Sequence, residues 1–129
     1  MESGFNTYKK ISVHTASKEQ ILLMLYEAAI KNCKLGIQAI ENKQIAKKGE
    51  YIGKFQDIIV ELNNGLDYNV DNKMASDLSS LYDYLLFTST NANINFDKKL
   101  LEDCLQVLLT LHSAWVEAVK SLKKSKENK

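Results

Sequence analysis

The absence of proline is the feature that most restricts how this chain folds. Its 129 residues include no proline and only five glycines. These two residue types most often end helices and form the turns between strands. Apolar residues instead recur at steps of three and four over long stretches, which is the period of an amphipathic helix. The sequence therefore predicts an all-α protein.

Three polar positions mark where helices begin. Ser17 and Gln20 fit a capping box, in which the serine hydroxyl accepts from the Gln20 amide and the glutamine side chain reaches back. Either Asp71 or Asn72 precedes the third periodic segment, and Asp97 is placed to cap the fourth. We expect four helices, the first beginning after Ser17.

The apolar residues of each segment share one face. The second helix is expected to end near residues 63–65, with Gly65 suited to a left-handed stop, and Gly36 lets two helices approach closely. Four such faces with short connections predict an antiparallel four-helix bundle. The inward residues are Leu22, Leu25, Tyr26, Ala29, Cys33, Gly36, Ile37 and Ile40; Ile52, Phe55, Ile59, Leu62 and Leu66; Ala75, Leu78, Tyr82, Leu85, Ser89 and Ala92; and Leu101, Cys104, Leu108, Leu111, Trp115, Val119 and Leu122.

The two ends of the chain differ from this bundle. Residues 17–122 are expected to form the bundle, and residues 123–129 a basic disordered tail. Residues 1–16 have no helical period and are expected to form an N-terminal arm. Four large apolar residues make that arm too apolar for a purely solvated tail: Phe5, Tyr8, Ile11 and Val13.

Composition excludes several classes of partner. Seventeen basic and sixteen acidic residues leave a net charge of +1, too small a field to favour nucleic acid or an anionic membrane. No apolar run is long enough to span a bilayer, and no signal segment opens the sequence. Two distant cysteines are too few for a disulfide framework, which favours a reducing compartment. We expect a cytoplasmic protein that is not embedded in a membrane.

Motifs for catalysis are absent from the sequence. Neither histidine follows a glutamate by three residues, as a di-iron bundle requires, and no phosphate loop, dinucleotide turn, zinc helix or nucleophile elbow occurs. Cys104 and His112 lie about two helical turns, roughly 12 Å, apart. Cys33 and Cys104 are interpreted as small core residues. We predict no enzyme, no metal site and no cofactor.

The fourth helix has more apolar surface than folding requires. Its apolar residues cover an arc of roughly 200°, about twice the width of a core-facing stripe. Leu105, Leu109 and Val116 extend one flank, and Leu100 and Val107 extend the other. One interpretation is a central helix buried on both sides. The other is an exposed apolar groove for an amphipathic partner helix. Apolar residues outside the stripes of other helices favour a groove: Met24, Leu35, Tyr84 and Phe87.

The ordered segments resemble the flagellin export chaperone family, FliS. Tyr8 precedes a Thr-Ala-Ser run at 15–17 and a Met-Leu-Tyr run at 24–26, as in the family's first signature. Further blocks follow in family order: Gln56-Asp57-Ile58-Ile59-Val60-Glu61-Leu62 with Leu66-Asp67, then Leu81-Tyr82-Asp83-Tyr84 with Ala92-Asn93, and Trp115. Departures from the pattern occur at four positions: Glu27, Ala28, Phe55 and His112.

The resemblance implies a cytoplasmic type III export chaperone of the bacterial flagellum. Such a protein binds the C-terminal segment of flagellin, prevents its premature polymerisation and delivers it to the export apparatus. The implied partners are flagellin, a component of the membrane export gate and a co-chaperone. An adaptor for another amphipathic segment or a flagellar regulator is the alternative. We expect Tyr8 and Ile11 of the arm to cover the binding surface or to pad the bundle's end. The full set of candidate partner-binding residues is Tyr8, Ile11, Tyr84, Phe87, Leu105, Leu109 and Val116.

Overall fold

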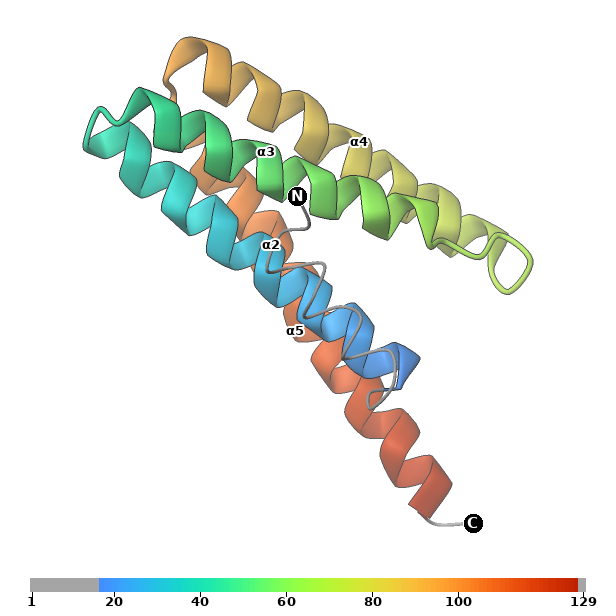
Figure 1. Cartoon of the computed structure of the whole chain (residues 1–129). Helices are drawn as coiled ribbons and strands as arrows, with labels where there is room; N and C mark the ends of the chain where they lie inside the picture. Colours follow the sequence, from blue (N-terminus) through green and yellow to red (C-terminus); the bar gives the residue numbers. More distant parts are fainter. Residues whose placement is uncertain (1–16, 128–129) are drawn as a thin grey trace, which may run out of the picture.

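The computed structural model describes residues 17–127. Within that range the chain forms four helices: α2 (Lys18–Glu41), α3 (Ile45–Asn64), α4 (Asn72–Asn95) and α5 (Lys98–Glu127). Helix α2 packs against α3 and α5, and α4 packs against the same two helices. Consecutive helices run in opposite directions (Figure 1). The predicted all-α, antiparallel four-helix arrangement is confirmed.

The predicted helix starts are also confirmed. Ser17 Oγ accepts from the Gln20 amide at 3.2 Å, and Gln20 Oε1 accepts from the Ser17 amide at 3.1 Å, which completes the capping box. Asp71 caps α4 by accepting from the Met74 amide at 2.9 Å. Asp97 Oδ1 accepts from the Lys99 amide at 3.0 Å at the start of α5. Local side chains therefore set these boundaries.

The structure differs from expectation in the backbone conformation after α3 and in the length of α5. Helix α3 ends at Asn64 as expected, but Gly65 has a φ of −86°, so the expected left-handed stop is wrong. Its amide still bonds the Glu61 and Leu62 carbonyls, and this right-handed ending needs no glycine. Helix α5 continues to Glu127, so residues 123–127, expected in a disordered tail, are helical. Lysine and glutamate, which make up four of these five residues, have high helix propensity and favour continuation of α5.

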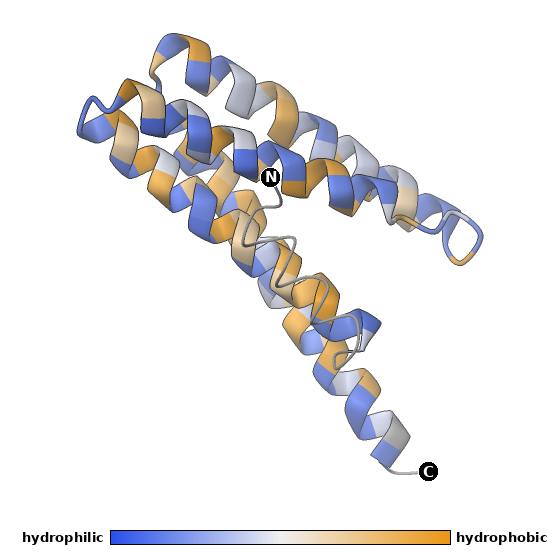
Figure 2. Cartoon of the chain, viewed as in Figure 1, coloured by the Kyte–Doolittle hydropathy of each residue, from blue (hydrophilic) through white to orange (hydrophobic). Residues whose placement is uncertain are grey.

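The core lies between the four helices. Its largest fully buried side chains include Tyr26, Tyr82, Phe55 and Leu108. Around every helix hydrophobic and hydrophilic residues alternate, as expected for amphipathic helices (Figure 2). A Cβ at Gly36 would lie 3.3 Å from side-chain carbons of both Ile52 and Leu101, so the expected close approach at this glycine is confirmed.

Both cysteines are buried in this core as free thiols. Cys33 Sγ donates to the Leu101 carbonyl at 3.3 Å, and Cys104 Sγ donates to the Leu85 carbonyl at 3.9 Å. Burial raises the pKa of each thiol to about 12. They remain protonated at neutral pH and act as small core residues, as predicted.

One end of the bundle is closed by a buried lysine. Lys48 Nζ donates to the Asn93 carbonyl at 2.6 Å and lies 3.6 Å from the centroid of the Phe96 ring. Phe96 caps α4 in the left-handed region, with a φ of 54°, which is unfavourable for a bulky residue. The cation–π contact helps to hold Phe96 there and connects the start of α3 to the turn between α4 and α5.

The opposite end is open. Figure 1 shows that the α3–α4 pair and the α2–α5 pair lie together at the closed end and diverge toward the end where α2 and α4 begin. Helix α5 extends beyond the start of α2. Leu122 of α5, which was expected to lie inside, is 42% exposed. Val119, also expected inside, is only half-buried. The divergence leaves apolar surface at the open end without a neighbouring helix.

Candidate partner-binding site

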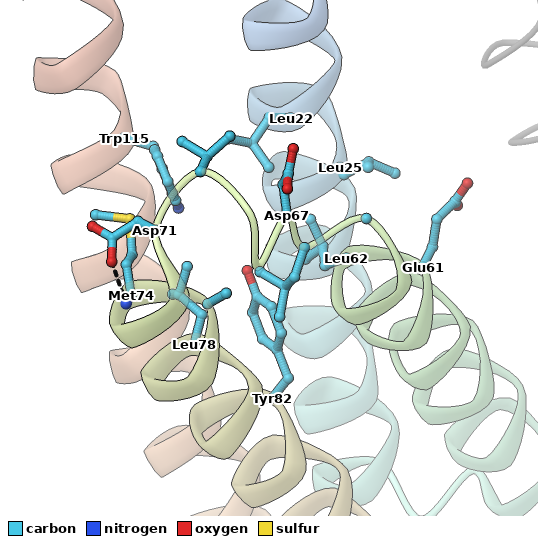
Figure 3. A pocket seen from close by; sticks show the side chains of 14 residues that line it. Leu22, Leu25, Glu61, Leu62, Asp67, Asp71, Met74, Leu78, Tyr82 and Trp115 are labelled. Carbon is cyan, nitrogen blue, oxygen red and sulfur yellow. Dashed lines mark hydrogen bonds between the residues drawn. The ribbon is translucent and has the colours of Figure 1, made fainter.

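A cavity of about 290 Å³ occupies the open end of the bundle. Its walls come from all four helices and from the loop between α3 and α4 (Figure 3). We call it the open-end cavity. Its lining residues are Leu22, Leu25, Glu61, Leu62, Gly65, Leu66, Asp67, Val70, Asp71, Met74, Ala75, Leu78, Tyr82 and Trp115.

The loop of residues 65–71 forms one side of the cavity. Asp67 Oδ1 accepts from the Asn69 amide at 2.9 Å within this loop, and Asp71 ends the loop as the N-cap of α4. Leu66 packs against the core, whereas the Val70 side chain is 82% exposed although it lines the cavity. Met74 is exposed as well. The cavity therefore has buried walls and an uncovered apolar rim.

Two tyrosines form a polar contact below these apolar walls. The Tyr26 and Tyr82 hydroxyl oxygens lie 2.5 Å apart in a buried hydrogen bond. Burial raises the pKa of Tyr26, while hydrogen bonds from Tyr82 and Trp115 partly oppose the rise. Burial also raises the pKa of Tyr82, and the adjacent Tyr26 adds to that rise. Both phenols stay protonated at neutral pH, so they can anchor α2, α4 and Trp115 but supply no base.

Among residues 17–127, the charged residues at the cavity are acidic. Glu61, Asp67 and Asp71 line it, and no lysine, arginine or histidine of this range does. The nearby Lys73 donates to Asp77 at 2.8 Å. Because the whole chain is nearly neutral, with a net charge of +1, this acidity is a local property of the open end. The cavity is suited to binding an apolar surface, with negative charge at its edge.

The residues predicted to bind a partner lie elsewhere. Tyr8 and Ile11 are outside the described residues. On α4, Tyr84 and Phe87 are 43% and 71% exposed, and neither lines the cavity. These two form an apolar surface on the outside of the bundle. Their role in binding stays a prediction.

The three candidates on α5 are also separate from the cavity. Leu105 packs against the core and is only half-buried, Val116 is half-buried, and Leu109 is 36% exposed. Of the opposite flank, Leu100 and Val107 also pack against the core. Most of the wide apolar arc of α5 therefore serves packing, and Leu109 is the most exposed part of the flank predicted to form a groove.

Sequence reasoning missed the cavity itself. Leu22, Leu78, Tyr82 and Trp115 were placed correctly on inward faces, but helical period could not show that the helices diverge beside them. A signal was present in the loop. Residues 65–71 connect two helices on the surface and still carry exposed Tyr68 and Val70. Large apolar residues in a short surface loop indicate a contact with something outside the bundle.

The described residues offer no catalytic or metal-binding arrangement. Residues 17–127 contain no group of three histidine, cysteine, aspartate or glutamate side chains placed to hold a metal ion. Both thiols are buried away from the cavity lining. Among the same residues, no helix is long and apolar enough to cross a bilayer. The geometry of the site supports binding.

Comparison with known proteins identifies the family. The family model described as "Flagellar protein FliS" matches residues 1–122. The flagellar secretion chaperone FliS of Bacillus subtilis (strain 168) is 32% identical over 126 residues, which cover 98% of this chain and 93% of that protein. This chain belongs to the FliS family. Its predicted assignment is confirmed.

Other relatives agree with that assignment. The flagellar secretion chaperone FliS of Vibrio cholerae (strain El Tor Inaba N16961) is 34% identical over 119 residues, covering 89% of this chain and 88% of that protein. A crystal structure of a bacterial flagellar chaperone has the same fold, with a TM-score of 0.76 over 92% of this chain and 99% of that one, at 16% identity. FliS proteins are chaperones of flagellar secretion and not enzymes, so the prediction of a non-enzymatic flagellar chaperone is confirmed.

Proposed function

We propose that this FliS protein acts in the cytoplasm and binds the C-terminal segment of flagellin before export. By covering that segment it prevents premature polymerisation, and it then delivers the cargo to the flagellar export apparatus. Membership of the FliS family supports the flagellar role. The observation that carries the binding role is the open-end cavity, whose apolar rim includes the largely exposed Val70.

The physical basis is burial of apolar surface. An unassembled segment that forms an amphipathic helix can place its apolar face against Leu22, Leu25 and Leu66 and cover Val70. Each apolar square ångström removed from water contributes about 25 cal/mol. A cavity near the lower limit for ligand sites, about 300 Å³, accommodates a few side chains from such a helix better than a large cofactor.

The outer surfaces of α4 and α5 are proposed as further contacts along an extended cargo. Phe87 on α4 and Leu109 on α5 remain exposed and apolar outside the cavity. A cargo segment longer than one helix can reach several such patches, each of which adds affinity. Delivery implies binding of the loaded chaperone to an export-gate component, with a co-chaperone as a further partner. The arm that contains Tyr8 and Ile11 is proposed to cover part of this surface when cargo is absent.

Binding to flagellin is the direct test. Purified FliS should bind full-length flagellin from the same organism with about one-to-one stoichiometry, as measured by calorimetry. Removal of the C-terminal segment of flagellin should abolish binding, whereas an N-terminal truncation of similar length should not. Equal binding of both truncated forms would place recognition elsewhere. Capture of a different flagellar protein with no affinity for flagellin would favour the adaptor alternative.

Deletion of residues 1–14 tests the arm. The helix start at Ser17 and its capping box remain, so the bundle should keep its melting temperature. If the arm covers the binding surface, the deletion should alter flagellin affinity and increase the fluorescence of a bound hydrophobic dye. Unchanged affinity and fluorescence would assign Tyr8 and Ile11 to packing alone.

A further inference from the structure

We propose that the open-end cavity selects a cargo segment in which a lysine or arginine lies about one helical turn from the apolar residue that enters the cavity. This proposal rests on the proposed function and adds the chemistry of the segment. Asp67 and Asp71, which lie at the edge of the apolar walls, are the residues that would bind the partner's cation. Both residues are exposed, so they can reach a partner without a change in the bundle.

The rim of the cavity carries negative charge. Asp67 and Asp71 line the cavity, and within residues 17–127 no basic residue does, in a chain that has one more basic than acidic residue. Lys73, the described cation nearest to Asp71 in the sequence of α4, donates to Asp77 at 2.8 Å and has a weaker electrostatic interaction with Asp71. A partner that brings its own cation gains a favourable field at this rim, while an acidic partner is repelled.

Each rim aspartate uses one carboxylate oxygen in a local hydrogen bond. Asp67 uses Oδ1 to accept from the Asn69 amide, and Asp71 uses Oδ1 to accept from the Met74 amide. Within residues 17–127, no hydrogen bond is made to Oδ2 of either aspartate. The local bonds hold each side chain in place, which lowers the entropy lost when its second oxygen binds a cation.

The two aspartates lie next to the apolar surface of the cavity. Val70 and Met74 line the cavity, are exposed, and flank Asp71 in sequence. On a helix, side chains three and four residues apart share a face. A partner helix that places an apolar residue against Val70 and Met74 therefore carries its neighbouring residue, one turn away, to Asp67 or Asp71. Lysine and arginine also contribute their apolar stems to such a contact.

The test is a pair of matched double variants. Asp67→Asn with Asp71→Asn removes the rim charge but keeps both local hydrogen bonds, because asparagine caps helices about as well as aspartate. The control, Asp57→Asn with Asp83→Asn, removes the same charge from exposed positions that do not line the cavity. Melting temperatures of both variants are measured first to establish that they fold.

Affinity for the flagellin C-terminal segment is then measured at low and high salt, using a fluorescently labelled peptide. The rim variant should bind roughly three- to tenfold more weakly at low salt, with a smaller salt dependence than wild type. The control variant should match wild type within about twofold. Equal affinities of the rim variant and the control would overturn the proposal. Failure of wild-type FliS to bind the peptide would instead refute the proposed function on which it rests.

Peptide variants identify the cation. Each lysine and arginine of the labelled segment is changed to glutamine in turn. One of these changes should weaken binding to wild-type FliS and leave binding to the rim variant unchanged, which defines the pair by a double-mutant cycle. If every change weakens binding to both proteins equally, the rim does not read a specific cation and the proposal is wrong.

Discussion

The hydroxyl oxygens of Tyr26 and Tyr82 lie 2.5 Å apart and join α2 to α4 across the interior of the bundle. Tyr82 also lines the open-end cavity, and so does Trp115 of α5, which is close enough to Tyr26 to partly oppose the rise in its pKa. Side chains of three helices therefore meet beside the cavity. The contact between the two tyrosines helps to fix the position of Tyr82 in the cavity wall.

Removing one hydroxyl of this pair should destabilise the bundle. Tyr82→Phe leaves the buried Tyr26 hydroxyl without its tyrosine partner and should cost about 1–2 kcal/mol of unfolding free energy. Tyr26→Phe should cost a similar amount. The double variant leaves neither hydroxyl unpaired and should cost less than the sum of the two. Urea unfolding measures all three, with exposed Tyr84→Phe as a control expected within about 0.5 kcal/mol of wild type. Fully additive costs would show that the hydroxyls do not interact.

The two buried thiols predict a loss of stability in alkali. Their pKa is raised by burial from about 9 in the unfolded chain to about 12 in the folded one. Below about pH 8 both states bind the protons, so this contribution to stability is complete. As pH rises further, the unfolded state releases them first. The free energy of unfolding should fall by roughly 2 kcal/mol between about pH 8.5 and 10.

A cysteine-free variant provides the control for that pH dependence. Cys33→Ala with Cys104→Ala is less stable at neutral pH but should lose less stability over the same alkaline interval. Urea unfolding at each pH gives both curves. Parallel curves for the variant and wild type would show that the thiols titrate alike in the folded and unfolded states.

Replacing glycine with alanine should change the stability of the protein in opposite directions at two positions. At Gly53, a Cβ would meet nothing within 4 Å, so Gly53→Ala should stabilise α3 by about 0.5–1 kcal/mol. At Gly36, a Cβ would lie 3.3 Å from Ile52 and Leu101, and Gly36→Ala should cost about 1–3 kcal/mol through overpacking. Melting temperature and urea midpoint show whether the Gly53 variant is more stable, and the Gly36 variant less stable, than wild type. A stabilised Gly36 variant would show that the interface between α2, α3 and α5 can relax.

The parts of the fold that were predictable depend on local chemistry or on the average period of a helix. Ser17 and Asp71 mark helix starts because their side chains bond amides three residues ahead. Leu108 was predicted inside because it lies at the centre of its apolar arc, and it is fully buried. Local signals have no information about the angle between helix pairs. That angle creates the open-end cavity, so its walls were assigned to the core.

The flank of α5 shows the same limit at single-residue scale. Leu105 and Leu109 lie one turn apart on the same side of the helix, yet Leu105 packs against the core and Leu109 is exposed. Neighbouring helices determine this difference, and the helical period does not contain their positions. The loop could have been recognised from the sequence alone, because Val70 is a large apolar residue between two predicted helices.

Substitutions at two adjacent leucines of α5 can distinguish effects on stability from effects on binding. Leu108→Ala should leave a cavity in the core and cost about 2–5 kcal/mol, because Leu108 is fully buried. Leu109→Glu should lower the melting temperature less than Leu108→Ala does, because Leu109 is partly exposed, but it should weaken flagellin binding if this flank contacts cargo. Melting temperature and affinity are compared for both variants. Unchanged affinity in the folded Leu109 variant would remove this flank from the binding surface.

Val70 tests whether cargo covers the rim of the open-end cavity. Its side chain is 82% exposed, so Val70→Gln removes little that the free protein has buried and should keep the melting temperature. In a complex that buries this residue, the change should weaken flagellin binding by about 1–2 kcal/mol, or roughly five- to thirtyfold. Glutamine leaves the charge of the rim unaltered, so the effect reports apolar burial alone. Val60→Gln on α3 is the matched control, because Val60 is exposed but does not line the cavity. Its affinity should equal that of wild type. If both variants bind as wild type does, cargo leaves the rim uncovered, and the exposed surfaces of α4 and α5 become the leading candidates for the binding site.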